Sequence, residues 1–351
     1  MSREIDFSNL DRIVQSALRH GAFTACCILV GQENRVLYRK AFGQLSIEED
    51  APVTSEQTRF DLGSLTKPLV VGMLALRALE EGCWQLSDRL DDFMDAPPDK
   101  AGITIRQLLT HTAGLGATHL WEKPGSAQNS GLAILNTPLL YAPGQNMRYT
   151  CSGYILLGQL LECLYQQPLD RLASQMVFER LNMRKTGYCP QEGNIAATEM
   201  QDDGRCLQGV VHDENARELG GVAGNSGVFS DMDDLALWMQ MLCCGGHLPD
   251  QTKYLSRPSL HLAMEPMAGT EIESRSLIFR LQDKQPNFMG DYFPRGSIGH
   301  TGFPGTSVVL SPEDGLYVVL LTNRICPSRD SSEIKRFRCL VHNAVYAAVC
   351  G

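Results

Sequence analysis

The sequence predicts an α+β fold, an α/β sandwich in which an antiparallel sheet is built from both ends of the chain. Two β-rich regions carry this prediction, one over residues 23–43 and one after residue 270. Helical patterns precede the first region and follow the second, so we expect terminal helices to flank the sheet. The residues between the two regions follow mostly helical spacing, which predicts an inserted helical domain.

The length and composition are consistent with two domains and a buried core. The chain has 351 residues, of which 43% are hydrophobic and 20% are charged. We expect residues 1–63 and 226–351 to form the sheet domain and residues 64–225 to form the mostly helical domain. A functional cleft is expected between the two domains.

The first elements are an amphipathic helix and a β-hairpin. The residues before Phe23 have apolar side chains at helical spacing. The runs FTACCILV (23–30) and RVLYRKAFG (35–43) are β-rich, and the GQEN between them is a hairpin signal.

The central region is expected to contain at least three helices. The run Leu69–Leu79 is apolar nearly all round, which indicates a buried helix, and Gly82 is placed to end it. A capping box, Thr104-x-x-Gln107, opens the helix IRQLLTH. The run SGYILLGQLLECLY (152–165) also follows helical spacing.

The second β-rich region completes the predicted sheet. Four segments, SLIFRLQ, SIGHTG, TSVVLSP and GLYVVLLTNR, read as successive strands separated by Pro and Gly. The last twenty residues before Gly351 have a helical pattern.

Charge and cysteine usage exclude several classes of function. The net charge of −9 argues against nucleic acid as a partner. No run reaches the roughly 18 consecutive apolar residues of a membrane span, and the N-terminus has no apolar core typical of a secretory signal. The 12 cysteines contain no C-x-x-C pattern, which indicates reduced thiols rather than a metal site. We therefore expect a cytoplasmic protein.

A serine and a lysine stand at the start of the first central helix. Free backbone N–H groups and the positive dipole end would surround Ser64, and Lys67 would project from the same helical face. Burial lowers the pKa of a lysine, so Lys67 could act as a base. The alternative is structural: Ser64 as an N-cap and Lys67 as a surface-reaching lysine. The pattern alone is weak, because Ser332-x-x-Lys335 repeats it in the terminal helix.

Two later segments add candidate residues. Tyr149 stands just before the helix at 152–165, and His300-Thr301-Gly302 lies on an expected strand. Taken singly, Tyr149 reads as a core aromatic and His300 as an ordinary strand residue.

Together, these segments resemble the serine β-lactamase and penicillin-binding-protein superfamily, above all its class C-like branch of esterases and D-amino-acid peptidases. The family pattern S-x-x-K, Y-x-N and K-T-G or H-T-G is matched by Ser64-Leu65-Thr66-Lys67, Tyr149-Thr150-Cys151 and His300-Thr301-Gly302. Other similar segments are LLTHTAGL (108–115), APGQ (142–145), VHDENARELGGVAGNSGVFS (211–230) and residues 299–324. The resemblance covers essentially the whole chain and implies a β-lactamase/transpeptidase-like fold.

The resemblance also implies roles for the motif residues. Ser64 would be the nucleophile that forms an acyl-enzyme, and Lys67 and Tyr149 would share the proton transfer, with the base left open. The backbone N–H groups of Ser64 and Phe303 would form the oxyanion hole. His300, with Thr301 and Gly302, would face the cleft and orient Tyr149 or a substrate carboxylate. No metal or organic cofactor is implied.

Cys151 departs from the family pattern, which usually has Asn at this position. A thiol replaces poorly the donors and the acceptor of an amide. In the family this amide helps to hold the lysine and the acyl side chain of the substrate, so the departure predicts weaker recognition of β-lactams.

The favoured function is a serine hydrolase acting on a small-molecule ester or amide. A β-lactamase or a D-alanyl-type carboxypeptidase or aminopeptidase is the alternative, and an inactive scaffold on the same fold is disfavoured by the intact Ser64, Lys67 and Tyr149. The sequence has no G-x-S-x-G and no H-E-x-x-H. His111 and His212-Asp213-Glu214 are interpreted as structural, and the oligomeric state is left open.

Overall fold

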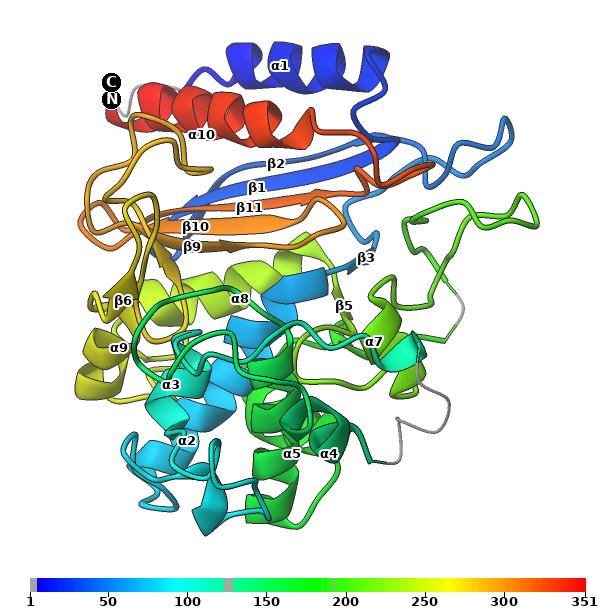
Figure 1. The fold of residues 1–351 in the computed structure, drawn as a ribbon. Coiled ribbons are helices and arrows are strands. Elements are labelled where there is room, and N and C mark those ends of the chain that lie inside the picture. Colours follow the sequence, from blue (N-terminus) through cyan, green and yellow to red (C-terminus); the bar gives the residue numbers. More distant parts are fainter. Residues whose placement is uncertain (1–4, 123–128, 192) are drawn as a thin grey trace.

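The fold is built in layers around an antiparallel sheet (Figure 1). The computed structural model describes residues 5–122, 129–191 and 193–351. The α-helices are α1 (Ser8–Arg19), α2 (Met73–Glu80), α3 (Ile105–Leu109), α4 (Ser130–Leu135), α5 (Ser152–Tyr165), α6 (Leu169–Ala173), α7 (Glu214–Glu218), α8 (Met232–Cys243), α9 (Arg257–Met264) and α10 (Ile334–Cys350). Short 3-10 turns form η1 (Gly63–Leu65), η3 (Leu90–Asp92) and η4 (Leu120–Glu122), and π-helical turns form η2 (Lys67–Gly72) and η6 (Ser174–Phe178).

The main sheet combines strands from both ends of the chain, as the sequence predicted. Its strands are β1 (Ala25–Gln32), β2 (Arg35–Gly43), β6 (Ala268–Gly269), β7 (Ser274–Arg275), β8 (Arg280–Leu281), β9 (Ile298–Thr301), β10 (Ser307–Ser311) and β11 (Leu316–Thr322). They lie in the order β2-β1-β11-β10-β9-β8-β7-β6. The predicted hairpin joins β1 to β2, and β1 pairs on its other side with β11. A second sheet has the order β3 (Phe60–Asp61), β5 (Val228–Ser230), β4 (Gly187–Tyr188).

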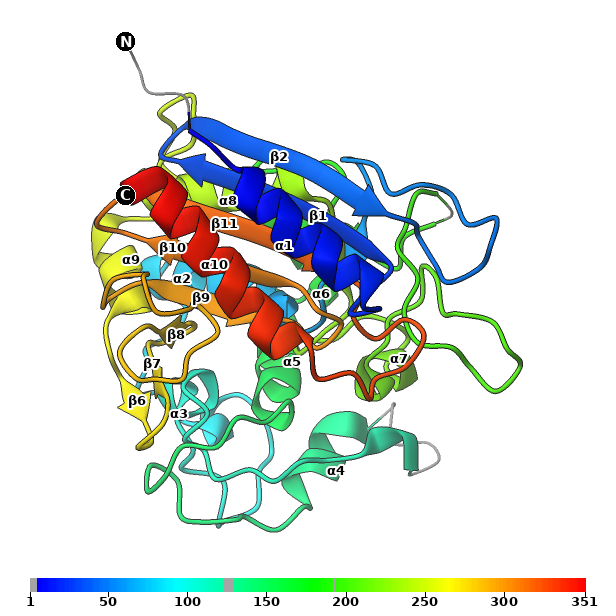
Figure 2. The same cartoon turned by 90° about the horizontal axis from the view of Figure 1, so that it is seen from above.

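Alternate side chains of the central strands belong to two different cores. Cys26, Ile28 and Val30 of β1 pack in the core that includes residues of α1 and α10. Their neighbours Cys27 and Leu29 pack in the larger core on the opposite face, with residues of α8 and the inserted helices. Figure 2 shows α1 and α10 side by side above the sheet. The period of two explains why residues 25–30 of β1 are all hydrophobic, since both faces of the strand are covered.

One predicted strand is much shorter than expected. In SLIFRLQ only Arg280 and Leu281 form β8. Ser276 and Phe279 close a turn, in which Ser276 N–H donates to Phe279 O at 2.9 Å and Phe279 N–H donates to Ser276 Oγ at 3.0 Å. A serine side chain that bonds to nearby backbone in this way competes with the strand ladder.

The inserted region contains the predicted helices but also long irregular stretches. The capping box of α3 forms from both sides, and α5 covers the whole run 152–165. Residues 136–151 and the described part of 189–213 contain no helix. Pro138, Pro143 and Gly144 explain the first of these stretches, because proline removes a donor and glycine at positive φ favours a turn. Within the described residues, no helix has the length and apolar character needed to cross a membrane.

Candidate active site

A cavity of about 780 Å³ opens where the helical run starting at η1 meets the edge of β9. Its lining includes Ser64, Tyr149, Cys151, His300, Thr301, Gly302 and Phe303. Lys67 is fully buried beside Ser64. The structure therefore brings together all eight residues that the sequence singled out. Ser332 and Lys335, the second S-x-x-K pair, lie on the rim of the same cavity.

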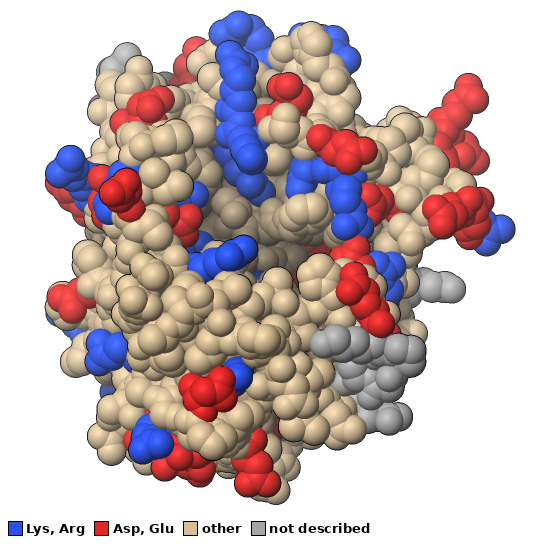
Figure 3. Space-filling view, viewed as in Figure 1, with Lys and Arg blue, Asp and Glu red and all other residues tan. Residues whose placement is uncertain are grey.

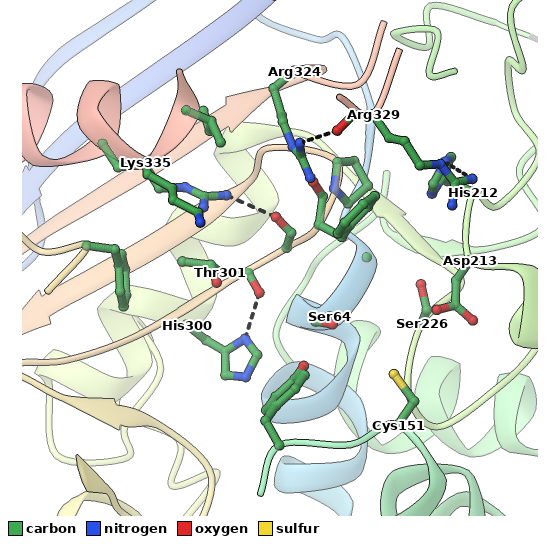
Figure 4. A pocket seen from close by; sticks show the side chains of 18 of the residues that line it. Ser64, Cys151, His212, Asp213, Ser226, His300, Thr301, Arg324, Arg329 and Lys335 are labelled. Carbon is green, nitrogen blue, oxygen red and sulfur yellow. Dashed lines mark hydrogen bonds between the residues drawn. The ribbon is translucent and has the colours of Figure 1, made fainter. Parts of the chain in front are cut away.

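Ser64 and Lys67 are in direct contact. Lys67 Nζ donates to Ser64 Oγ at 3.0 Å and to the carbonyl oxygen of Asn225 at 3.0 Å, and it lies 3.5 Å from Cys151 Sγ. Their positions on adjoining turns, η1 and η2, give this contact, since residues three apart lie on one helical face. Figure 4 shows Ser64 on this helical run, with Cys151 and His300 on different sides of it.

The charge state of Lys67 differs from the sequence-based expectation. Burial lowers its pKa, but the charges of Cys151 and Tyr149 act in the opposite direction and raise the pKa above its usual value. The direction of this shift favours the ammonium form of Lys67 over a base made neutral by burial.

The ring of Tyr149 is surrounded by cationic and aromatic groups. The Arg275 guanidinium lies 4.8 Å from the ring centroid and Lys67 Nζ lies 5.1 Å from it. The rings of His111 and His300 have their centroids 4.5 Å and 6.1 Å away. The side chain is held on several faces, although Tyr149 keeps 37% of its surface exposed to the cavity side.

His111 packs directly behind Tyr149. It follows α3 with a left-handed φ of 59°, and its Nδ1 accepts a hydrogen bond from Thr150 N–H at 3.4 Å. Its ring also lies 5.1 Å from the Tyr154 ring. Burial lowers the pKa of His111 well below the usual value, so the imidazole is neutral. The residue holds the backbone and ring at the Tyr149 position, which agrees with a structural reading.

His300 presents a defined tautomer to the cavity. Burial lowers its pKa well below the usual value, so the ring is neutral. Its Nδ1 lies 3.0 Å from the carbonyl oxygen of Thr301. Because a carbonyl only accepts hydrogen bonds, Nδ1 carries the proton and Nε2 is left as an acceptor.

The backbone N–H of Phe303 lies beside the residue that precedes Ser64. A methyl group added to Gly63 would lie 3.2 Å from Phe303 N and 2.5 Å from Pro304 Cδ. Gly63 has φ +51°, so it meets both a conformational and a spatial requirement for glycine. No group in the described residues accepts a hydrogen bond from Phe303 N–H. The Phe303 N–H, expected to be one of two oxyanion donors, therefore lies close to the backbone that precedes Ser64.

Several cations of the cavity have no matching carboxylate. Arg275 and Arg280 share one carboxylate, Glu273, with the Arg275 contact at 2.6 Å and the Arg280 contact at 3.9 Å. Arg324, Lys335 and Arg338 form no ion pair with a carboxylate in the described parts of the chain. Figure 3 shows basic side chains bordering a hollow in this face.

The segment His212-Asp213-Glu214 forms loop contacts next to the cavity. His212 Nε2 lies 2.8 Å from Glu199 Oε2, and Glu214 forms an ion pair with Arg329 at 2.6 Å. Asp213 caps α7 and accepts a hydrogen bond from Asn225. In the described residues, no group of three or more His, Cys, Asp or Glu side chains is arranged to hold a metal ion.

Sequence reasoning missed several residues that contact the predicted ones, among them Asn225, Arg275 and Arg338. Asn225 lies in a quoted family-like segment, so that segment was a signal for it. Arg275 and Arg338 carry no motif, and their contacts with Tyr149 and Gly302 arise only from the tertiary fold.

Comparison with known proteins gives consistent matches over most of the chain. The profile described as Beta-lactamase matches residues 10–338. A protein of Escherichia coli K12 named putative D-alanyl-D-alanine carboxypeptidase is 29% identical over 363 residues, which covers 90% of this chain and 82% of the relative.

Two solved structures share the fold. EstCE1, described as a hydrolase with promiscuous acyltransferase activity, has a TM-score of 0.78 at 22% identity, covering 96% of this chain and 97% of that one. The octameric penicillin-binding protein homologue from Pyrococcus abyssi also has a TM-score of 0.78, at 18% identity, covering 98% of this chain and 78% of that one.

Proposed function

Because the chain belongs to the beta-lactamase family, we propose that it is a serine hydrolase that forms an acyl-enzyme on Ser64 and acts on esters or small amides. The observation that carries this proposal is the 3.0 Å contact between Lys67 Nζ and Ser64 Oγ at the edge of an open cavity. A charged hydrogen bond of this kind places the serine oxygen and stabilises it as its proton leaves. The substrate is expected to be a small molecule.

The proton of Ser64 is proposed to pass to Tyr149. Lys67 carries its own proton in the resting site, so it serves as the electrostatic partner in this step. Its ammonium group, 5.1 Å from the Tyr149 ring centroid, would stabilise the phenolate form. Tyr149 would then return the proton to the leaving group, and water would release the acyl group by the same route.

The developing negative charge would be held by two backbone donors. The N–H groups of Ser64 and Phe303 are proposed to bind the substrate's carbonyl oxygen as it becomes an oxyanion. The neutral His300 would accept a hydrogen bond at Nε2, from Tyr149 or from the substrate.

A D-alanyl-type carboxypeptidase is the second candidate. Its substrate ends in a carboxylate, and the cations Arg324, Lys335 and Arg338 have no carboxylate partner in the described residues that line this cavity. The name of the Escherichia coli relative also supports a carboxypeptidase.

The half-buried thiol of Cys151 supports the first candidate instead. It stands in place of the family's amide and favours substrates without an amide side chain.

The test is covalent labelling followed by turnover with two substrates. We expect a fluorophosphonate probe to label the wild type on Ser64, and Ser64→Ala to abolish both labelling and hydrolysis of p-nitrophenyl esters. Ser332→Ala is the matched control, because Ser332 belongs to the other S-x-x-K pair on the same cavity rim. Equal labelling of Ser64→Ala would overturn the assignment. Release of D-alanine from a peptide ending in D-Ala-D-Ala, faster than ester hydrolysis, would favour the second candidate.

A further inference from the structure

One peptide unit links the proposed oxyanion donor to a buried arginine. The N–H of Phe303 and the C=O of Gly302 belong to the same planar peptide group. Arg338 Nη2 donates to that carbonyl oxygen at 2.9 Å. In a trans peptide the N–H and the C=O point in opposite directions, so a group that fixes the carbonyl also fixes the direction of the N–H.

Arg338 reaches this peptide from the C-terminal helix. It lies on α10, it is 7% exposed, and the same Nη2 also donates to Thr306 O at 2.8 Å. Gly302 N–H donates to Thr306 O at 2.7 Å across the turn between β9 and β10. The guanidinium therefore binds carbonyl oxygens on both sides of this turn.

Arg338 forms no ion pair with the described residues. None of the described carboxylates lies within salt-bridge distance of it, and its buried Nε has no hydrogen-bond partner in the described structure. Burial and the nearby Arg324 lower its pKa to about 9, which leaves the guanidinium charged at neutral pH. Burying a cation without a carboxylate is costly, so a purely structural turn contact is a poor explanation of this residue.

We propose that Arg338 is a positioning residue that orients and polarises the Gly302–Phe303 peptide, so that the Phe303 N–H binds the oxyanion. The inference rests on the proposed acyl-enzyme function and adds a residue to it. A cation bound to the carbonyl end of a peptide increases the positive partial charge at the N–H end, because hydrogen bonds in a chain polarise one another. A fixed, polarised donor is what transition-state stabilisation requires.

The neighbouring arginine cannot have this role. Arg324 Nε donates to the carbonyl oxygen of Phe303 at 2.9 Å, one peptide further along. The residue after Phe303 is Pro304, so that peptide has no N–H to polarise.

The first experiment compares Arg338→Met, Arg338→Lys and Arg336→Met on a neutral ester. Arg336 is exposed on the same helix and does not line the cavity, so its variant is the matched control. A neutral p-nitrophenyl ester carries no carboxylate, which removes any effect of Arg338 on anion binding. We expect Arg338→Met to lower kcat about tenfold or more with little change in KM, Arg338→Lys to recover part of the rate, and Arg336→Met to behave as wild type.

A spectroscopic measurement covers the case in which Arg338→Met does not fold. The infrared carbonyl frequency of the acyl-enzyme reports how strongly the oxyanion hole polarises the bound ester. In Arg338→Lys we expect this band to move to a higher frequency than in wild type, a change that a turn-stabilising role would not cause.

The outcomes separate this inference from the proposed function. A labelled wild type in which Arg338→Met keeps its kcat, or Arg338→Lys keeps the infrared band, would overturn the inference and leave the function standing. A wild type that is not labelled on Ser64 would overturn both. A loss confined to KM for anionic substrates would show that Arg338 binds substrate instead, and would also reject the inference.

Discussion

Lys67 donates a hydrogen bond to Ser64 across 3.0 Å while its ammonium group is completely buried. The same ammonium group also donates to the Asn225 carbonyl at 3.0 Å and lies 3.5 Å from the Cys151 thiol. A buried ammonium that contacts both the proposed nucleophile and the backbone of a neighbouring loop is expected to act together with these partners.

Removing Lys67 and Tyr149 should be strongly non-additive. Each of Lys67→Ala and Tyr149→Phe should lower kcat/KM for an ester by about a hundredfold or more, as expected for loss of a proton-transfer group. The double variant should be close to the worse single variant, because both residues serve one step. The measurement is a double-mutant cycle on kcat/KM. A double variant whose loss equals the product of the two single losses would contradict a shared step.

Replacing Cys151 by asparagine should favour cephalosporins over esters. The amide would restore hydrogen bonds that a thiol cannot make, each worth about 1–3 kcal/mol when the partner is buried, or roughly tenfold to a hundredfold in acylation rate. The quantity to compare is the ratio of kcat/KM for a cephalosporin to that for a p-nitrophenyl ester. Cys163→Asn, at an exposed position on α5, the helix that Cys151 precedes, is the control. An unchanged ratio would mean that Cys151 does not limit recognition of β-lactams.

Gly63→Ala should lower the activity as well as the stability of the protein, because the added methyl meets a steric contact in addition to an unfavourable backbone conformation. The residue has φ +51°, and an added methyl would lie 2.5 Å from Pro304 Cδ and 3.2 Å from Phe303 N. We expect at least a tenfold loss of kcat in addition to destabilisation of about 1–3 kcal/mol. Gly82→Ala is the matched control, because Gly82 has φ +70° with nothing within 4 Å of the added methyl. If both variants lose stability equally and neither loses activity, the Gly63 contact does not position the donor.

His342 should make the protein less stable as the pH falls below neutral. Burial lowers its pKa from about 6.5 to about 4. Between these values the unfolded chain binds a proton that the folded chain does not, so folding stability falls from pH 6.5 to pH 4 and then levels off, by roughly 3 kcal/mol in total. Asp231 has its pKa raised to about 6 by burial and gives the opposite slope in this range.

Because other groups also titrate in this range, the test compares the pH dependence of stability between wild type and a His342 variant. We expect the free energy of unfolding in urea to depend less steeply on pH in His342→Gln than in wild type. Identical slopes for the two proteins would show that His342 does not contribute.

The sheet and the motif residues could be predicted because their signals are local. The hairpin of β1 and β2 and the helix α5 follow directly from residue spacing and turn residues. Ser64, Tyr149 and His300 could be grouped because short motifs carry each of them. The extent of β8 could not be predicted, since a side-chain bond from Ser276 ends it.

The electrostatics of the site could not be read from the sequence. The pKa of Lys67 depends on Cys151, which is 84 positions away, and the carbonyl of Gly302 is held by Arg338, 36 positions away. Such contacts depend on how distant elements pack, and no local pattern specifies them. Burial alone predicted the wrong direction for Lys67, because the charges around a buried group can outweigh its desolvation.

The pairing of β1 with β11 has a consequence for synthesis on the ribosome. Cys26 lies opposite Thr322. One edge of β1 therefore stays unpaired until almost the whole chain has been synthesised. Until then that edge carries unpaired N–H and C=O groups between hydrophobic side chains, a state prone to aggregation. Pairing over such a sequence separation is also slow. The unpaired edge of β1 is therefore where we expect unfinished chains to associate with one another until β11 is complete.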